Sequence, residues 1–443
     1  MSLAPPESVQ KLQTALHGKA KESSGYRFYA LYDKVCRRDV LTHAYERCRA
    51  NGGAAGVDGQ TFEDIEAYGP GRWLNELADK LRSKTYRSQA VRRVWLPKPD
   101  GTQRPLGIPT VSDRVAQMAV LLVLEPIFEA DLPPEQYAYR SGRSAHDAVE
   151  QVSKWLRTGH SQVVDADLSG YFDSIPHAEL MKTLARRISD GSVLAVINQW
   201  LVAPVEETDA HGQMRRTSRN KDERRGTPQG APISPLLSNL YMRRFILGWK
   251  VLGHEQRLGA HIVNYADDFV ICCRGTATQA MQAMQAMMAR LKLTVNEAKT
   301  HVCRLPEETF DFLGFTFGRY HSPRSGRASL QYWPSRKRVT RLYGVVSEMT
   351  SRRWLFLEVS ERIAMLNRTL VGWRNYFARG AFWKAFRSVD RHVWVRLRRW
   401  LCRKHKVRGS GGDTYPLDYL YGELGIVSLE RTVRRQGLPR AKP

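Results

Sequence analysis

The stretch IVNYADDFVICC, Ile262 to Cys273, decides the fold class of this chain. Nearly every residue in it is apolar or β-branched, which predicts a buried pair of strands. Asp267 and Asp268 stand side by side at its centre, and burying two adjacent carboxylates without partners is costly. We therefore place both acids at the tip of a β-hairpin, where neighbouring side chains need not diverge as they do within a strand.

A second apolar run, VVDADLSGYF (163–172), also delivers acids, Asp165 and Asp167. If the two runs form neighbouring strands of one sheet, three carboxylates can converge, and divalent cations would then neutralise them. Oxygen ligands favour Mg²⁺, and a pair of Mg²⁺ ions about 4 Å apart can activate a 3′-hydroxyl and stabilise a leaving pyrophosphate. The alternative is that these acids are ordinary turn residues.

The charge of the chain indicates a polyanionic partner. Its 443 residues carry 69 Lys and Arg against 44 Asp and Glu, a net charge of +25. Residues 333–443 hold 25 of the basic and 8 of the acidic residues, so +17 of the charge lies in the last quarter. This asymmetry predicts a polymer-binding C-terminal domain on a more neutral body, with nucleic acid as the first candidate partner and an acidic membrane surface as the second.

The cysteines and the N-terminus indicate an intracellular protein. None of the six cysteines forms a CxxC pair, and Cys402 with His405 has no second half, which argues against a zinc site. The N-terminus lacks the apolar region of a signal peptide, and no apolar run approaches the roughly 18 residues of a membrane span. We expect a cytoplasmic protein.

Periodicity and turn residues predict the order of the elements. We expect helices over 6–50, 74–83, 111–130 with Ser112 as its cap, 178–202 and 278–291. Hairpins are expected over 91–108 and 262–273, and a glycine-rich break over 51–60. The Met281, Met284 and Met288 stripe predicts core packing. A stretch rich in Gly, Ser, Pro and Arg (318–335) predicts a boundary, followed by a mostly helical region.

Residues 383–408, WKAFRSVDRHVWVRLRRWLCRKHKVR, interleave tryptophans with cations. Cations contact phosphates and rings stack on bases, while the alternative is a helix that packs its tryptophans on its own domain with solvated arginines outside. We expect both to hold. The candidate RNA- and DNA-binding residues here are Arg396, Arg398, Arg399, Arg403 and Lys404.

Seven or more ordered blocks make the chain resemble the reverse transcriptases encoded by group II introns, which also serve as maturases. They are NGGAAGVDGQT, LPKPDGTQRPLGIPTVSDRVAQ, YAYRSGRSAHDAV, VVDADLSGYFDSIPH, GTPQGAPISPLLSNLY, NYADDFV, LKLTVNEAKTHV, FDFLGFTFG and LNRTLVGWRNYF. The third block departs from the family, which more usually has Phe-Arg-Pro there. The last block resembles the thumb, or X, domain and adds Arg374 to the candidate RNA-binding residues.

The resemblance implies an α+β, right-hand polymerase, with fingers and a palm built on an antiparallel sheet, followed by an α-helical thumb and maturase domain. We expect an N-terminal helical extension and the start of the fingers over 1–90, and the fingers and palm over 91–325. A basic α-helical thumb/maturase domain with a C-terminal tail is expected over 330–443. By analogy with bacterial members of the family, the protein would associate with the nucleoid when insertion occurs. The implied activity is RNA-directed DNA synthesis, with intron RNA binding that assists splicing and retrohoming.

The resemblance also assigns site residues. Asp167 and Asp267 would bind both metal ions, Mg²⁺ or alternatively Mn²⁺, and Asp268 would complete one site; Asp165 is not required. Lys299 is a candidate general acid for the pyrophosphate, or else a solvated lysine. Asn296 would shape the loop that carries it.

The nucleotide and template are assigned to further residues. Lys98 and Arg104 would hold the triphosphate, and Gln229 and Gly230 would lie against nucleotide and template. Phe172 would select deoxynucleotides by excluding a 2′-hydroxyl, or else be a core aromatic.

The implied partners are a group II intron RNA, an RNA template, a DNA primer and dNTPs, with no membrane. A monomer and a homodimer both stay open. The His-Asn-His endonuclease domain of many family members is not visible, so we expect no DNA cleavage. Two alternatives are a related reverse transcriptase recruited to host defence or repair, and a non-enzymatic splicing factor with a relict palm.

Overall fold

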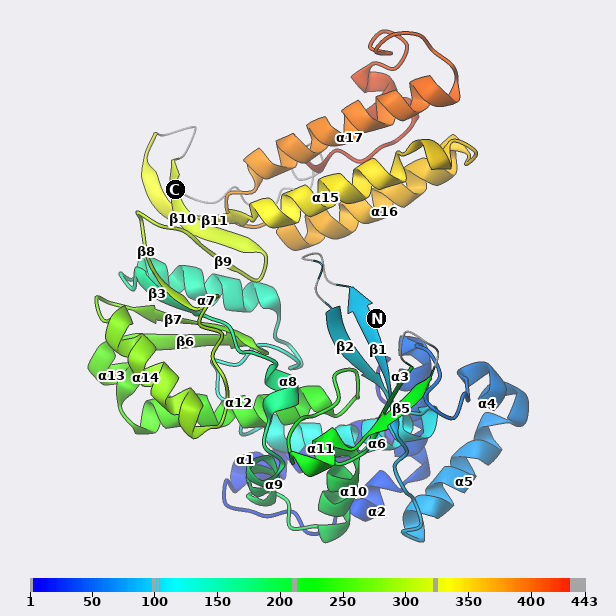
Figure 1. Ribbon diagram of the computed structural model, residues 1–443, viewed down its shortest axis with the longest axis vertical. Coiled ribbons are helices and arrows are strands. Elements are labelled where there is room, and N and C mark those ends of the chain that lie inside the picture. Colours follow the sequence, from blue (N-terminus) through cyan, green and yellow to red (C-terminus); the bar gives the residue numbers. More distant parts are fainter. Residues whose placement is uncertain (1–2, 98–100, 102, 209–212, 322–325, 431–443) are drawn as a thin grey trace. The chain divides into compact units, whose positions relative to one another are not determined.

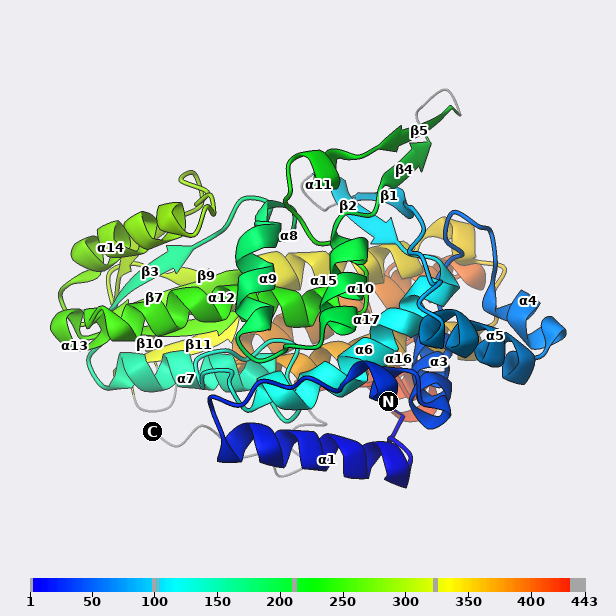
Figure 2. The ribbon, with the colours of Figure 1, turned by 90° about the horizontal axis from the view of Figure 1, so that it is seen from below.

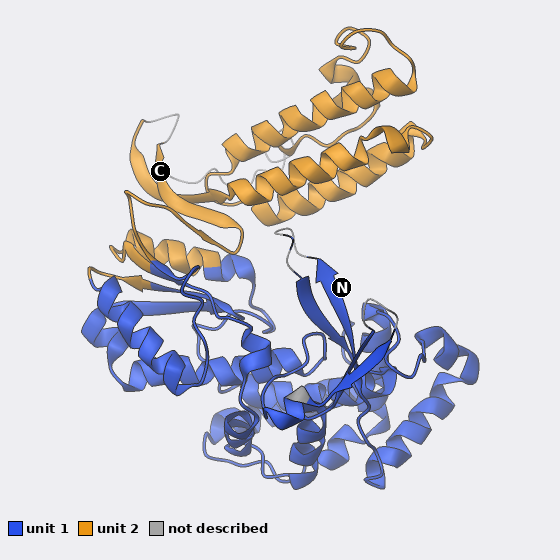
Figure 3. Ribbon diagram, viewed as in Figure 1, with its two compact units in different colours: residues 1–148, 164–271, 276–301 blue, residues 149–163, 272–275, 302–443 orange. Residues whose placement is uncertain are grey.

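The computed structural model describes residues 3–97, 101, 103–208, 213–321 and 326–430 (Figure 1). The chain divides into two compact units (Figure 3). Unit 1 comprises residues 1–148, 164–271 and 276–301, and unit 2 comprises residues 149–163, 272–275 and 302–443. The mixed helix and strand content, with mostly antiparallel pairing, confirms the α+β class.

Unit 1 begins with short helices around an apolar core. They are α1 (Glu7–Glu22), α2 (Tyr32–Val35), α3 (Arg38–Asn51), α4 (Phe62–Tyr68) and α5 (Pro70–Arg82). The helix predicted over 6–50 is broken at residues 23–31, and α4 was not predicted, although Thr61 and Asp64 form a capping box at its start. In α5, Trp73, Leu77 and Leu81 recur at helical spacing and are buried.

The first sheet has the strand order β2-β1-β4-β5. The hairpin predicted over 91–108 is confirmed, because β1 (Val91–Pro97) and β2 (Gln103–Ile108) pair antiparallel with Arg92 opposite Ile108. Strand β4 (Val205–Thr208) joins β1 in parallel, and β5 (Met214–Thr217) pairs with β4. Figure 2 shows β4 and β5 projecting away from the helices of unit 1. Neither of these strands was predicted.

Helix α6 (Val111–Glu129) fills the centre of the helical part and is buried over most of its length. Its predicted cap, Ser112, is wrong: the cap is Thr110, whose side chain accepts a hydrogen bond from the Asp113 N–H at 3.1 Å. The helix predicted over 178–202 is two helices, α9 (His177–Ala185) and α10 (Gly191–Leu201). The second begins because Asp190 caps it, accepting from Ser192 N.

The second sheet has the strand order β6-β7-β3-β8. Its strands are β6 (Ala260–Tyr265), β7 (Asp268–Cys273), β3 (Gln162–Ala166) and β8 (His301–Arg304). Helix α12 (Ser234–Val251) packs on it, with the rings of Phe245 and Phe269 5.5 Å apart and Trp249 Nε1 donating to Ala260 O. Because β7 is buried on both faces after its first residue, its sequence is a continuous apolar run.

The other helices up to residue 290 are α7 (Ala145–Arg157), α8 (Tyr171–Ser174), α11 (Arg219–Asp222), α13 (His254–Leu258) and α14 (Ala277–Arg290). In α14, Met284 and Met288 are fully buried, which confirms the predicted core packing, while Met281 is half-buried.

Unit 2 contains a third sheet of order β11-β10-β9 and a helical part. The strands are β9 (Phe310–Phe312), β10 (Phe315–His321) and β11 (Ala328–Pro334), so the stretch 318–335, where we expected a boundary, contributes paired strands of one hairpin. The predicted helical region follows as α15 (Arg336–Met349), α16 (Val359–Phe377) and α17 (Trp383–Lys404), with a 3₁₀ turn at Arg352–Trp354 and a π-helical turn at Tyr419–Glu423. No helix among the described residues is both long and apolar enough to cross a membrane.

Candidate active site

Asp267 lies in the tight turn between β6 and β7. The turn consists of Ala266 and Asp267, and Ala266 takes a positive φ of +59°, which is uncommon for a residue other than glycine. The side chain of Asn264 holds this shape, because its Nδ2 donates to the carbonyl oxygens of Ala266 at 2.8 Å and Asp268 at 3.4 Å. Asp267 is half-buried and Asp268 is exposed, so the hairpin tip relieves the charge that a continuous strand would bury.

Asp167 follows directly after β3 and is held by the loop that precedes β8. Its carboxylate oxygen Oδ2 accepts from Asn296 Nδ2 at 3.1 Å and lies 3.4 Å from Lys299 Nζ. Its backbone N–H donates to Thr300 Oγ1 at 3.2 Å, and its carbonyl oxygen accepts from Asn296 N at 2.8 Å. Both the backbone and the carboxylate of Asp167 are therefore fixed in place, and Asn296 does more than shape its own loop.

The hypothesis that the acids converge requires the strands that carry them to be neighbours. Strand β7 does lie beside β3 in the second sheet. Tyr171 stands four residues after Asp167, and its pKa is raised mainly by burial. The negative charge of Asp267 raises this pKa further, so Asp267 acts on the segment that follows Asp167. Among the residues the structure describes, however, no three His, Cys, Asp or Glu side chains are grouped closely enough to hold a metal ion as they stand.

The chemistry of the donors nevertheless fits a divalent cation. Carboxylate oxygens are the ligands that hard cations such as Mg²⁺ prefer. Asp167 would have to exchange its contacts with Lys299 and Asn296 for such an ion, while Asp267 and Asp268 sit at an open turn.

The loop 226–231 packs directly on strand β2. Arg104 Nε donates to Gln229 Oε1 at 3.0 Å, and Gly107 N donates to Gln229 O at 2.6 Å. Gly230 has a φ of +112°, and a Cβ there would lie 2.6 Å from the carbonyl oxygen of Gly107, so only glycine fits. Two predicted nucleotide-binding residues thus contact each other, while Lys98 lies outside the described residues.

Phe172 lies in α8 with its ring buried, 6% exposed, edge-on to Tyr171. Its carbonyl oxygen accepts from Thr227 N at 2.8 Å, so its backbone anchors the loop that carries Gln229.

Tyr139 was missed by the sequence analysis. It has a positive φ of +56° and is 51% exposed. Its pKa is raised, first by burial and then by the charge of Asp267, while Arg104 opposes this shift. The charges of Asp267 and of Arg104 on β2 therefore both act on this phenol. The signal that could have found it is its block, YAYRSGRS, which departs from the usual family pattern.

The six predicted RNA-binding cations of unit 2 differ in their surroundings. Arg374 is buried, and Arg396 donates to Ser347 O at 2.8 Å and to Thr350 Oγ1. Arg398 donates to Tyr415 O, and Lys404 donates to two carbonyl oxygens of the loop before α16. Arg399 and Arg403 are exposed. Four of the six therefore make intramolecular contacts.

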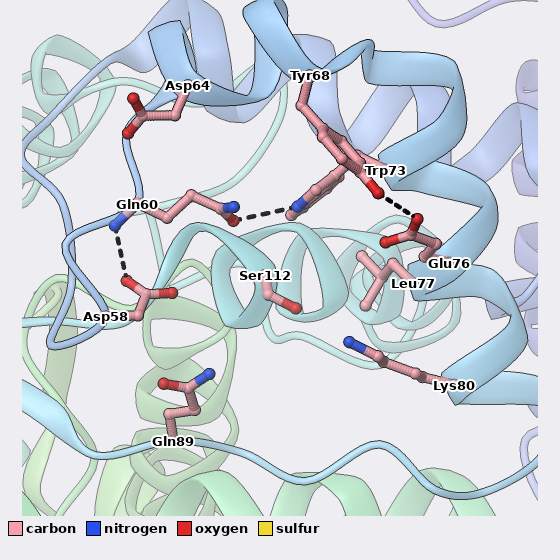
Figure 4. Close-up of a pocket in the computed structure, with 10 residues that line it drawn as sticks. All are labelled: Asp58, Gln60, Asp64, Tyr68, Trp73, Glu76, Leu77, Lys80, Gln89 and Ser112. Carbon is pink, nitrogen blue, oxygen red and sulfur yellow. Dashed lines mark hydrogen bonds between the residues drawn. The ribbon is translucent and has the colours of Figure 1, made fainter.

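A cavity of about 500 Å³ lies among the N-terminal helices (Figure 4). Its acids already have structural partners: Asp64 caps α4, and Glu76 accepts from the Tyr68 hydroxyl at 2.6 Å. Because its acidic lining repels phosphates and none of the strand acids reaches it, this cavity is not the active site.

Comparison with known proteins identifies the class. Residues 96–317, half of the chain, match the family described as reverse transcriptase (RNA-dependent DNA polymerase), and residues 339–415 match the group II intron, maturase-specific domain. The chain belongs to the reverse transcriptase family and is an RNA-directed DNA polymerase of the group II intron type with a maturase domain. Enzymes of this family generally use divalent metal ions.

Particular relatives support this placement. The chain is 31% identical over 351 residues to Protein YkfC of Escherichia coli K12, covering 71% of this chain and 89% of that protein. It is 31% identical over 228 residues to the group II intron-encoded protein LtrA of Lactococcus lactis, covering 51% of this chain and 36% of LtrA. It is 24% identical over 418 residues to an uncharacterised 91 kDa protein in the cob intron of Schizosaccharomyces pombe, covering 78% of this chain and 50% of that protein.

Proposed function

We propose that this chain extends a DNA primer along an RNA template with dNTPs, using Asp167, Asp267 and Asp268 to hold two Mg²⁺ ions. The observation that carries the assignment is that β7, which follows Asp267, lies beside β3, which precedes Asp167. The primer 3′-hydroxyl attacks the α-phosphate, a new P–O bond forms, the bond to the β-phosphate breaks, and pyrophosphate leaves. The metal ions, when bound, polarise the phosphate and lower the pKa of the hydroxyl.

The residues of the chain have separate tasks in this proposal. Arg104 exchanges its contact with Gln229 for the triphosphate, because a guanidinium binds phosphate in a bidentate manner. Gln229 is then released towards the nucleotide and template. Lys299 already lies 3.4 Å from a carboxylate of the acid group and is an ammonium that can protonate the leaving pyrophosphate.

The fingers and palm would comprise the residues up to about 325, and the thumb and maturase domain would comprise the residues from 330 onward. The maturase part would bind the intron RNA that encodes the protein, assist its splicing and direct its insertion into host DNA. This takes place in the cytoplasm and at the nucleoid. The cations for RNA would be Arg399 and Arg403, since both are exposed, with the other four predicted residues organising the surface.

The test is primer extension on poly(rA)–oligo(dT) with dTTP and Mg²⁺. The wild-type chain should extend the primer, and Asp267→Ala should not. Extension by Asp267→Ala at the wild-type rate would refute the metal assignment. Phe172→Ala should raise ribonucleotide incorporation, and unchanged sugar selectivity would return Phe172 to the core.

The maturase role has a separate test. An intron RNA found next to the reading frame should splice faster with the protein, and Asp267→Ala should retain this effect because splicing assistance needs no carboxylate of the polymerase site. No acceleration of splicing by the wild-type protein would remove the maturase assignment and leave the polymerase.

A further inference from the structure

The loop between α15 and α16 presents an exposed aromatic side chain. Phe356 is 71% exposed, and Arg352 and Arg353 beside it are also exposed. A single exposed apolar residue is common on protein surfaces, so exposure alone indicates nothing. What distinguishes this loop is how its backbone and its surroundings are organised.

The backbone on both sides of Phe356 is held from α17. Lys404 Nζ, at the end of that helix, donates to Leu355 O at 3.0 Å and to Leu357 O at 2.9 Å. Leu357 N also donates to Trp354 O at 3.3 Å. The ring is therefore displayed on a fixed loop, and a fixed contact residue loses little conformational entropy when a ligand binds.

A layer of rings and guanidinium groups lies next to Phe356. The ring of Trp354 is 6.0 Å from that of Phe356, and the guanidinium carbons of Arg353 and Arg362 lie 5.2 and 5.1 Å from the Trp354 ring. Arg353 forms an ion pair with Glu348, which also accepts from Trp354 Nε1 at 3.2 Å. The indole is thus fixed beside two cations.

Arg362 is a buried cation, and two of its three guanidinium nitrogens lack a hydrogen-bond partner among the described residues. It is 1% exposed, and among the described residues its Nε and Nη2 have no acceptor. Burial lowers its pKa. The charge of Glu361 opposes this shift. Because a buried guanidinium with unpaired N–H groups is unfavourable, a further anion nearby would stabilise this part of the unit.

More cations lie at the same end of α17. Arg396, Arg399 and Arg403 stand three and seven residues apart on α17, spacings that place them on one face of the helix. In agreement, the pKa of Arg396 is lowered by burial and then by the charges of Arg403 and Arg399. Arg396 itself donates to Thr350 Oγ1, at the start of the loop. An exposed ring bordered by clustered cations matches single-stranded nucleic acid, in which bases stack on rings and phosphates contact cations.

We propose that Phe356 is a stacking platform for an unpaired base of single-stranded nucleic acid, with Arg352 and Arg353 contacting the adjoining phosphates. The site rests on the proposed function only in that the maturase part of the chain binds nucleic acid. RNA and DNA share this stacking chemistry, and the experiment separates them.

The experiment uses the full chain and three fluorescein-labelled probes of one mixed sequence: single-stranded RNA, single-stranded DNA and duplex RNA. Binding is followed by fluorescence anisotropy at fixed salt. Phe356→Ala should weaken binding of a single strand about tenfold, leave duplex binding unchanged, and be rescued by Phe356→Tyr. The matched control is Tyr29→Ala, an aromatic of equal exposure at 70%, which should bind as the wild type does. The single-stranded probe, RNA or DNA, whose affinity falls more in Phe356→Ala is then assigned as the natural ligand of this site.

Photocrosslinking of RNA that carries 5-iodouridine supplies a readout of position, and the crosslink should map to residues 351–358. Wild-type affinity of Phe356→Ala for both single strands, or equal loss for the duplex, overturns the proposal and points to a protein or membrane contact instead. A wild-type chain that binds the probes but never extends a primer would refute the proposed function and not this site.

Discussion

The β6–β7 hairpin and helix α17 both carry charged side chains that the sequence marked for function, yet the structure treats the two sets differently. Asp267 and Asp268 lie at the turn between β6 and β7, and the side chain of Asn264 holds the backbone of that turn. In α17, by contrast, Arg396, Arg398 and Lys404 donate to backbone carbonyl oxygens of their own unit. A long cation on a helix can satisfy unpaired carbonyl groups of neighbouring elements, so a cation that the sequence marks for ligand binding can serve the fold instead.

The largest effect is expected at the hairpin. Asp267→Asn keeps the size of the side chain but removes its charge, and we expect primer extension to fall by at least about a hundredfold. The thermal midpoint should be nearly unchanged, because the side chain is only half-buried and asparagine has the same shape. The matched control is Asp33→Asn, an exposed carboxylate elsewhere in unit 1. If Asp267→Asn kept most of the wild-type rate of primer extension, Asp267 would not be a metal ligand of the reaction.

The next effect tests the contact between the loop 226–231 and β2. Gly230→Ala places a Cβ 2.6 Å from the Gly107 carbonyl oxygen at a φ of +112°, and we expect a loss of about 1–3 kcal/mol in the free energy of unfolding with a raised KM for dNTP. Gly253→Ala is the control, because Gly253 also has a positive φ but has no atom within 4 Å of the added Cβ. It should lose about 1 kcal/mol with no change in KM. Equal effects of the two substitutions would argue against a role for this contact.

A pair of arginines on α17 divides the cations into structural and binding groups. Arg396→Ala removes hydrogen bonds to Ser347 O and Thr350 Oγ1 and should lower the free energy of unfolding by about 1–2 kcal/mol. Arg399→Ala should leave unfolding unchanged, weaken RNA binding several-fold, and reduce the slope of log K against log salt by about 1. Thermal melts and salt titrations measure both. A loss of stability in Arg399→Ala, with unchanged stability in Arg396→Ala, would contradict the assignment of Arg396 to the fold and of Arg399 to RNA binding.

The smallest effect concerns a carboxylate with a structural role. The hydrogen bond from Arg37 to Asp39 lowers the pKa of Asp39 to about 2, with a further contribution from the Ser8 hydroxyl. A lowered pKa in the folded state contributes stability above the ordinary value near 4, and that contribution disappears as the pH falls towards 2. Asp39→Asn should therefore lower stability at pH 7 by up to about 1 kcal/mol, since the pair is partly solvated, and by nearly nothing at pH 2. Denaturant titrations at the two pH values measure this. A constant difference between pH 7 and pH 2 would show that charge has no part in it.

The local sequence pattern predicted the elements whose apolar spacing or turn residues lie within a few residues of one another. The β6–β7 hairpin, the β1–β2 hairpin and the α14 core stripe follow from periodicity that reads over a few residues. Strands β4 and β5 were not predictable in this way. All four side chains of β5 are exposed, so β5 has no apolar pattern of its own. It forms by pairing with β4, which in turn pairs with the edge of β1. The break at 23–31 has the same origin: Phe28 N donates to Arg187 O, a partner more than 150 residues away.

The candidate site divides in a similar manner. Asp167, Asp267 and Asp268 were found because acids inside apolar strands are unusual, and Gln229 and Gly230 because they stand in a Gly/Pro loop. Tyr139 was not found, because the unusual block in which it stands does not by itself show that its phenol feels the charge of Asp267, an acid more than a hundred residues later. The contacts of Asn296 and Lys299 with Asp167 also cross about 130 residues of sequence.

The sequence by itself determined the class of this protein, because the spacing of acids, glycines and apolar runs is a local chemical requirement that can be read along one strand or turn. Only the tertiary structure decided which charges are used by the fold and which remain for a ligand. Whether an arginine such as Arg396 or Arg399 finds a carbonyl oxygen depends on which segments pack beside it. That proximity is set by long-range packing, which no single stretch of sequence contains.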